Sequence, residues 1–125
     1  MKNVNIFHGT GCTPNSFWFP YVKRELERCY KVWIPLLPNA DHPDLKNWLP
    51  VAQEGSYTKD TVVIGHSAGC PLALSVIEKL TSPIRLAILV SGYARQKPEW
   101  KNPEKILQPS YDWKKIKKNV KELIY

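Results

Sequence analysis

The amino-acid sequence predicts an α/β domain built on a parallel sheet with helices on both faces. Short apolar segments of strand length alternate along the chain with longer stretches in which apolar residues recur at helical spacing. The segment at 61–65, Thr-Val-Val-Ile-Gly, lacks charged side chains, as expected for a strand buried on both faces of a parallel sheet. Such alternation is typical of α/β folds, and 125 residues are enough for one domain spanning residues 1–125.

The first part of the chain is expected to form two strands with a helix between them. Residues 4–7 are a short apolar strand ending at His8-Gly9, and residues 30–34 are a second strand closed by Pro35. Between these strands, Pro14-Asn15-Ser16 is expected to open a helix. The apolar face of this helix is formed by residues at helical spacing: Trp18, Val22, Leu26 and Cys29.

A loop marked by prolines, residues 35–43, leads to a second helix. Asp41 or His42 is positioned to cap this helix, with Pro43 in the first turn, where a missing N–H costs little. Pro50 falls inside the helical pattern and should kink or shorten it. Four apolar residues share one face of the helix: Leu45, Trp48, Leu49 and Ala52.

The second half is expected to contain three strands, the first at 61–65, and two helices. A helix over 68–80 is followed by a strand over 84–90 and then by a loop over 93–111 that contains three prolines. Asp112 is expected to cap a further helix, and residues 122–125 read as the last strand. The inward-facing residues expected on the two helices are Leu72, Val76 and Leu80 on the first, and Trp113, Ile116 and Val120 on the second.

Right-handed crossovers favour the strand order 2-1-3-4-5 for this arrangement. In that order the chain reverses direction between the first and third strands. Ligands of open α/β sheets bind in the crevice at such a point, at the carboxyl ends of the strands. The loops that flank this crevice are residues 8–13 and residues 66–68, so the functional site is expected there.

The motif Gly65-His66-Ser67-Ala68-Gly69 matches Gly-x-Ser-x-Gly and lies between a buried strand and an amphipathic helix. This is the setting of a nucleophile elbow, which holds a serine in a strained conformation with its hydroxyl exposed at the top of the sheet. Glycine is needed at 65 and 69 because a side chain there would collide with neighbouring backbone. A structural or phosphate-binding turn is the weaker interpretation, since neither loop contains Gly-x-Gly-x-x-Gly and no Gly-Lys-Ser/Thr is present.

Backbone N–H groups around this turn can form an oxyanion hole. The helix after Ser67 begins with unpaired N–H groups, of which that of Ala68 can face a tetrahedral intermediate. A second donor is expected from the loop after the first strand, where the candidates are Gly9, Thr10 and Gly11. One such donor typically stabilises a transition state by about 3–4 kcal/mol.

Four segments together resemble the small α/β-hydrolase-fold serine hydrolases of the retinoblastoma-binding protein nine and YdeN-like family. They are Phe-His-Gly-Thr-Gly at 7–11, Ser-Phe-Trp-Phe-Pro at 16–20, Leu-Pro-Asn-Ala-Asp-His-Pro at 37–43 with Leu45 and Trp48-Leu49, and the motif around Ser67. The resemblance covers the whole chain. It implies an α/β-hydrolase-like fold and a carboxylesterase-like serine hydrolase that acts on small esters or amides, with Ser67 as its nucleophile.

The resemblance also implies a Ser-His-Asp triad, whose acid and base are expected to be absent from this chain. In the family the Asp follows the strand that matches residues 120–125, and the His follows one strand later. The hydrolase-like sheet is therefore expected to be incomplete at its C-terminal edge. An unprotected last strand invites pairing with another chain, so we expect self-association through this edge.

The histidines and aspartates of the chain offer no convincing substitute for the missing partners. His66 precedes the serine and should point away from its hydroxyl, His8 is better explained as shaping the loop after the first strand, and His42 as a surface residue. The aspartates read as helix caps or turn residues: Asp41, Asp44, Asp60 and Asp112. A catalytically inactive hydrolase-fold binding module, or a truncated relic, is therefore the alternative function.

Composition excludes several other classes of protein. The net charge is +7, but the lysines of the last helix lie opposite its apolar residues, as on an ordinary solvated face, so no nucleic-acid partner is expected. No apolar run approaches the ~20 residues that span a bilayer, and we expect a cytoplasmic protein without a membrane partner. Three cysteines without a Cys-x-x-Cys pair indicate buried thiols rather than a disulfide framework, and neither a metal site nor a cofactor is expected.

Overall fold

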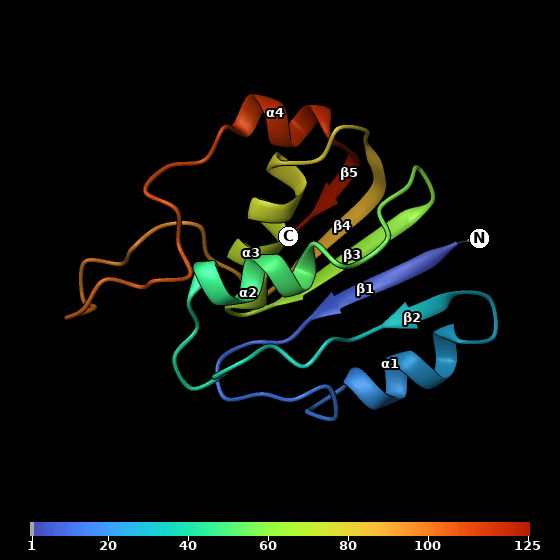
Figure 1. The fold of residues 1–125 in the computed structure, drawn as a ribbon, viewed down its shortest axis with the longest axis horizontal. Coiled ribbons are helices and arrows are strands. Elements are labelled where there is room, and N and C mark those ends of the chain that lie inside the picture. The colour runs from blue at the N-terminus through green and yellow to red at the C-terminus, as the bar shows by residue number, and fades with distance from the viewer. Residues whose placement is uncertain (1) are drawn as a thin grey trace.

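The computed structural model describes residues 2–125 and contains one five-stranded parallel sheet with four helices in this part of the chain (Figure 1). The sheet order is β2-β1-β3-β4-β5, and every neighbouring pair is parallel, which confirms the predicted topology. The strands are β1 (Asn3–Phe7), β2 (Lys31–Trp33), β3 (Thr61–His66), β4 (Ile84–Val90) and β5 (Val120–Ile124). The helices are α1 (Phe19–Leu26), α2 (Leu45–Ala52), α3 (Gly69–Glu78) and α4 (Trp113–Lys118).

Helices cover both faces of the sheet, as predicted. Ile6 of β1 packs in a cluster with Phe19 of α1, whereas the next residue, Phe7, packs with Trp48 of α2 and Leu72 of α3. Because successive side chains of a strand point to opposite faces, α1 lies on one face and α2, α3 and α4 lie on the other. In Figure 1, α1 is beside β2 at the bottom of the view and α4 is near β5 at the top.

Helix α1 begins later than the sequence indicated. Residues 13–16 form a turn in which the Thr13 N–H donates to the Ser16 hydroxyl at 2.9 Å and the Asn15 N–H donates to the Thr13 hydroxyl at 3.1 Å. These side chains satisfy the backbone locally and so compete with helix formation. The helix starts at Phe19 with Pro20 in its first turn, and it ends before Cys29, which is exposed rather than on its apolar face.

The cap of α2 also differs from the prediction. Asp44, rather than Asp41 or His42, is the N-cap, and its carboxylate accepts the Lys46 N–H at 3.1 Å. Pro43 disfavours a helical conformation at His42, which would have to be helical if Asp41 were the cap, and the extended backbone of Asp44, with φ −138° and ψ 124°, suits a cap position. Pro50 lies within the helix, which ends two residues later, and the predicted apolar face packs into the core with Trp48 and Ala52 fully buried.

The last helix is capped as predicted, since the Asp112 carboxylate accepts the Lys115 N–H at 3.1 Å. Ile116 is buried, but Trp113 is 44% exposed, so the prediction that Trp113 points inward is wrong. Val120 is buried as the first residue of β5, which begins two residues earlier than expected. Between α4 and β5, the Asn119 side chain donates to the carbonyls of Ile77 and Leu80 at 2.8 and 3.0 Å and so connects the start of β5 to the end of α3.

Helix α3 is the central helix of the domain and is buried from Gly69 to Ile77. Its Pro71 lies in the first turn, where no intrahelical N–H donor is needed. Within residues 2–125, no helix is long and apolar enough to cross a membrane.

Candidate active site

The carboxyl ends of β1 and β3 lie side by side at the centre of the sheet. From β1 the chain crosses to β2 on one side, and from β3 it crosses to β4 on the other, so this is the point at which the direction of the sheet reverses. The loop after β1 and the turn after β3 meet here, as the sequence predicted.

The turn after β3 has the geometry of an elbow. Strand β3 ends at His66, α3 begins at Gly69, and Ser67 between them has a φ of 53°. A left-handed conformation costs a non-glycine residue roughly 1–2 kcal/mol, so the surrounding structure must hold it in place. Two backbone hydrogen bonds do so: the Ser67 N–H donates to the Val90 carbonyl of β4, and the Cys70 N–H donates to the Ser67 carbonyl, both at 2.9 Å.

The glycines on either side of this turn are required by close backbone contacts. A Cβ added at Gly65 would lie 2.7 Å from the Gly69 carbonyl oxygen, and one added at Gly69 would lie 2.1 Å from the Phe7 carbonyl oxygen. Both distances are shorter than any real Cβ contact, and the atoms that are met belong to backbone, which cannot move aside cheaply. The prediction that only glycine fits these positions is confirmed.

The loop after β1 packs directly against the elbow. A Cβ at Gly9 would lie 2.9 Å from both the Ser67 Cβ and the His66 carbonyl oxygen, so glycine allows the two loops to touch. The Gly11 N–H donates to the Ala40 carbonyl at 2.8 Å, which removes Gly11 from the three oxyanion candidates of this loop. None of the hydrogen bonds found in residues 2–125 uses the N–H of Gly9, Thr10 or Ala68.

His8 is a structural residue. It is fully buried, and its Nε2 accepts the Leu37 N–H at 2.9 Å. A backbone N–H can only donate, so the imidazole proton is on Nδ1, which lies 3.1 Å from the Gly9 carbonyl oxygen and donates to it. Burial lowers the pKa of His8, while the bond to the Gly9 carbonyl partly opposes this. The ring is thus a neutral brace between the loop after β1 and the loop after β2.

His66 is surrounded by aromatic rings on the α1 side of the sheet. Its ring centroid lies 5.5, 5.8 and 5.6 Å from those of Phe17, Trp18 and Phe19. Its Nδ1 is buried and has no hydrogen-bond partner among residues 2–125, and burial lowers the pKa of the ring. Phe17 belongs to the segment 16–20 that carries the family resemblance but was not predicted to lie at the site; it is 74% exposed and has a φ of 48°.

Asp41 lies beside the loop after β1, with its Oδ1 3.5 Å from the position of a Cβ added at Gly11. The other candidates for a base or acid are engaged elsewhere or lie apart. His42 is exposed, Asp44 and Asp112 cap helices, and Asp60 lies in the turn before β3. In the described residues 2–125, no side chain forms a hydrogen bond with the Ser67 hydroxyl, and no group of three His, Cys, Asp or Glu side chains is placed to hold a metal ion.

The thiol nearest to the elbow in sequence is not a competing nucleophile. Burial raises the pKa of Cys70 to about 12, and its Sγ lies 3.4 Å from the Val90 carbonyl oxygen. A thiol is nucleophilic only as a thiolate, so Cys70 remains inert at neutral pH. Cys12 is buried as well, and of the three predicted buried thiols only Cys29 departs from the prediction.

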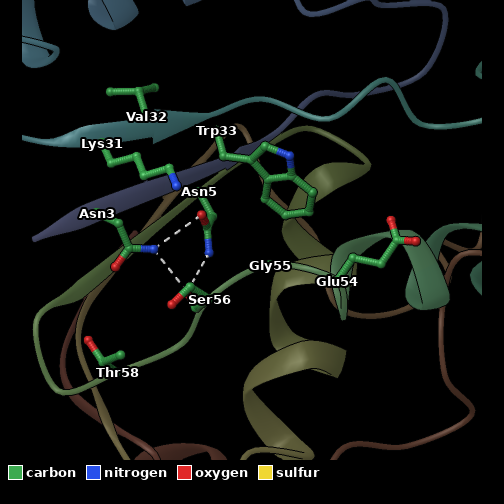
Figure 2. A pocket seen from close by; sticks show the side chains of 9 residues that line it. All are labelled: Asn3, Asn5, Lys31, Val32, Trp33, Glu54, Gly55, Ser56 and Thr58. Atoms are coloured by element: carbon green, nitrogen blue, oxygen red, sulfur yellow. Dashed lines mark hydrogen bonds between the residues drawn. The ribbon is translucent and has the colours of Figure 1, made fainter. Parts of the chain in front are cut away.

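A hollow of about 510 Å³ lies away from the crevice, at the amino ends of β1 and β2 (Figure 2). Its floor is formed by Asn3 and Asn5, whose amide groups both point toward Ser56 and donate to its carbonyl at 2.9 and 3.0 Å. The Thr61 hydroxyl donates to the Asn3 side chain at 2.7 Å. This network connects the loop after α2 to the sheet. The feature of the sequence that could have indicated it is the pair of asparagines in an otherwise apolar strand.

The parallel sheet, the strained serine between β3 and α3, and the glycine loop packed against it define the class of α/β-hydrolase-like proteins. Comparison with known proteins agrees with this class. A family model described as serine hydrolase matches residues 4–120. The chain therefore belongs to the serine hydrolase family that this model describes.

The chain is similar to the putative hydrolase YdeN of Bacillus subtilis (strain 168), with 33% identity over an alignment 125 residues long that covers 96% of this chain. It is also similar to the crystal structure of the ydeN gene product of B. subtilis, with a TM-score of 0.87 and 31% identity over 98% of this chain. The chain spans 66% of the length of the YdeN sequence and 69% of the YdeN structure. These matches confirm the predicted family resemblance and the predicted fold.

Proposed function

We propose that the crevice at the carboxyl ends of β1 and β3 is the acyl-transfer site of a serine hydrolase that acts on small esters or amides. The Ser67 hydroxyl oxygen attacks the carbonyl carbon of the substrate and forms a tetrahedral intermediate. Collapse of the intermediate breaks the bond to the alcohol or amine, which leaves with a proton. Water then attacks the acyl-serine and releases the carboxylic acid.

The oxyanion of the intermediate is held by backbone donors from both loops. The N–H of Ala68 supplies one donor, and the N–H of Gly9 or Thr10 supplies the other. The observation that supports this arrangement is the contact between Gly9 and Ser67, together with donors that have no partner within residues 2–125. Gly65, His66 and Gly69 position the serine without touching the reacting atoms.

In this proposal, none of residues 2–125 acts as a general base for Ser67. Both nitrogens of His8 are engaged, the ring of His66 packs among aromatic side chains, and His42 is exposed. Without a base the oxyanion hole alone sustains only a small part of the catalysis of a complete triad. We therefore expect slow acylation of Ser67 that added imidazole accelerates.

A fluorophosphonate probe tests the proposal by measuring the labelling rate with and without imidazole. We expect slow labelling that imidazole speeds up, that Ser67→Ala abolishes and that Ser91→Ala leaves unchanged. Ser91 is a matched control because it also follows a central strand, is exposed and has a φ of 52°. A folded protein that stays unlabelled in imidazole would contradict the proposal and leave an inactive hydrolase-fold binding module. Labelling that persists in Ser67→Ala would place the reactive group elsewhere.

A further inference from the structure

Four aromatic rings form a cluster beside the elbow, on the face of the sheet that α1 covers. This aromatic cluster consists of Phe17, Trp18, Phe19 and His66. The Trp18 ring stands nearly perpendicular to the His66 ring, at 86°, and to the Phe19 ring, at 73° with the centroids 4.6 Å apart. Aromatic pairs prefer such edge-to-face arrangements, so these contacts are favourable. A regular helix or strand would point three consecutive side chains in different directions, and the φ of 48° at Phe17 departs from both.

One side of the aromatic cluster leads directly to the serine. His66 is the last residue of β3 and precedes Ser67, whose left-handed conformation is held by backbone hydrogen bonds. The His66 carbonyl oxygen and the Ser67 Cβ each lie 2.9 Å from the position of a Cβ added at Gly9. The backbone that carries the His66 ring is therefore in contact with the loop after β1.

The other side of the aromatic cluster leads back to the same loop through a series of tight turns. A hydrogen bond from the Cys12 N–H to the Gly9 carbonyl, at 3.2 Å, closes the first turn. Hydrogen bonds from the Ser16 N–H to the Thr13 carbonyl and from the Phe19 N–H to the Ser16 carbonyl, both at 3.1 Å, close the next two. Because these turns leave the backbone little freedom, the position of the start of α1 constrains the position of the loop after β1.

We infer that Trp18 is a positioning residue of the proposed oxyanion hole. Its ring packs against that of His66 and so holds the loop after β1 beside Ser67. At this position the N–H of Gly9 or Thr10 can reach an oxyanion, and Trp18 acts through His66 rather than on the reacting atoms. That these N–H groups stabilise an oxyanion rests on the proposed function, whereas the effect of Trp18 on the loop does not. The ring contacts of the aromatic cluster lie beside β1 and β3 and involve no residue of β5.

Nitrogen-15 relaxation of the Gly9 and Thr10 amides tests the effect on the loop independently of any reaction. In the wild-type protein we expect order parameters of about 0.85, the value of rigid backbone. Trp18→Leu keeps an apolar side chain but loses the ring, so the order parameters should fall towards about 0.6. Trp18→Phe keeps a ring and should hold them near the wild-type value. Low values in the wild-type protein, unchanged values in Trp18→Leu, or equal falls in the two variants would overturn the inference.

Val22→Ala is the matched control for lost packing. Val22 lies one turn after Trp18 on α1 and packs on the same face of the sheet, but it is not part of the aromatic cluster. The substitution should lower the free energy of unfolding and leave the order parameters of the loop unchanged. An equal loss of order in Val22→Ala and Trp18→Leu would mean that any loosening of α1 releases the loop, and it would refute a specific role for Trp18.

The rate of labelling by a fluorophosphonate probe in imidazole tests the consequence for the reaction. Trp18→Leu should lower the maximal rate roughly tenfold and leave the probe concentration at half-maximal rate unchanged, because a misplaced donor weakens the transition state and not the binding of the probe. Trp18→Phe should restore most of the rate, and Val22→Ala should not lower it. An unchanged maximal rate in Trp18→Leu would overturn the inference even if the loop had loosened. Absence of labelling in the wild-type protein would contradict the proposed function, and the order parameters alone would then decide whether Trp18 positions the loop.

Discussion

Strands β1 and β5 are both five residues long and both parallel to their neighbours, but their environments differ. All five residues of β1 are buried, and the strand pairs with β2 on one side and β3 on the other. Strand β5 pairs only with β4, and Val120 is its one buried residue. The candidate active site is built at the end of β1, where the backbone is fixed from both sides.

The comparison shows that the strands that position Ser67 are distinct from β5, the strand at the edge of the sheet. The contacts that hold Ser67 come from β1, β4 and α3 and do not involve β5. Substitutions at the centre of the sheet, where β1 and the turn around Ser67 meet, should therefore disturb the fold and the site together. Substitutions in β5 should affect the edge of the sheet and leave the conformation of the turn around Ser67 unchanged.

The largest effect is expected for Gly69→Ala at the centre. The new Cβ would meet the Phe7 carbonyl oxygen at 2.1 Å, and neither backbone segment can yield. We expect the free energy of unfolding in urea to fall by about 3 kcal/mol or more. Gly11→Ala is the control. Gly11 also has an unfavourable φ, +68°, but a Cβ added there would lie 3.5 Å from its nearest neighbour, so the substitution should lower the free energy of unfolding by only about 1 kcal/mol. Equal losses would mean that the close approach at Gly69 does not matter.

His8→Phe should have the next largest effect. It removes the acceptor of the Leu37 N–H, which lies in a buried part of the chain, at a cost of about 1–3 kcal/mol. The measurement is again urea denaturation at pH 7. His42→Gln, at an exposed position, should be neutral, and a loss of the same size there would argue against a specific role for His8.

The His8→Phe variant also tests the pH dependence of stability. Burial lowers the pKa of His8 and of His66 in the folded protein, so the unfolded chain binds protons that the folded chain does not. The contribution of the two neutral rings to the free energy of unfolding should be full above a pH of about 6.5. It should fall as the pH drops below that value, with a slope of up to about 1.4 kcal/mol per pH unit for each histidine. His8→Phe should reduce this slope in urea denaturation between pH 5 and 7. A profile that stays flat from pH 7 to 5 would contradict the neutral state of both rings.

Asn119→Ala should have a smaller effect, centred on β5. It removes two hydrogen bonds to the carbonyls at the end of α3, worth about 1–2 kcal/mol together. Hydrogen exchange should show lost protection in the amides of β5 and unchanged protection in those of β1. Asn102→Ala, in an exposed loop, is the control. Equal loss of protection in both strands would mean that centre and edge unfold as one unit.

The smallest effect on stability is expected at the free edge, through which we propose that two copies of the chain pair. Ile124 is 46% exposed, and the outer side of β5 has no strand beside it in residues 2–125. Ile124→Lys should change the free energy of unfolding by less than about 1 kcal/mol but lower the dimer fraction in size-exclusion chromatography with light scattering. Tyr21→Ser, which alters an exposed residue of α1, should not lower it. A wild-type chain that stays monomeric at high concentration would refute the pairing.

The sheet and the elbow were predictable because their signals are local. An apolar strand, the Gly-x-Ser-x-Gly turn and an amphipathic helix follow one another in the sequence, and the structure has them in that order. The start of α1 was not predictable in this way, because hydroxyl groups at Thr13 and Ser16 stabilise a turn where a helix was expected. Interactions between distant segments were also hidden, such as the bond from Gly11 to Ala40 and the fastening of Ser56 by Asn3 and Asn5.

The exposure of Cys29 gives the molecule a single addressable thiol. Cys12 and Cys70 are buried, and the raised pKa of Cys70 keeps it protonated, so a maleimide dye at neutral pH should attach at Cys29. This position follows α1, on the side of the sheet that ends with β2. Two copies joined through β5 would then carry their dyes at opposite ends of a continuous ten-stranded sheet, and energy transfer between the dyes would report the direction in which the copies meet.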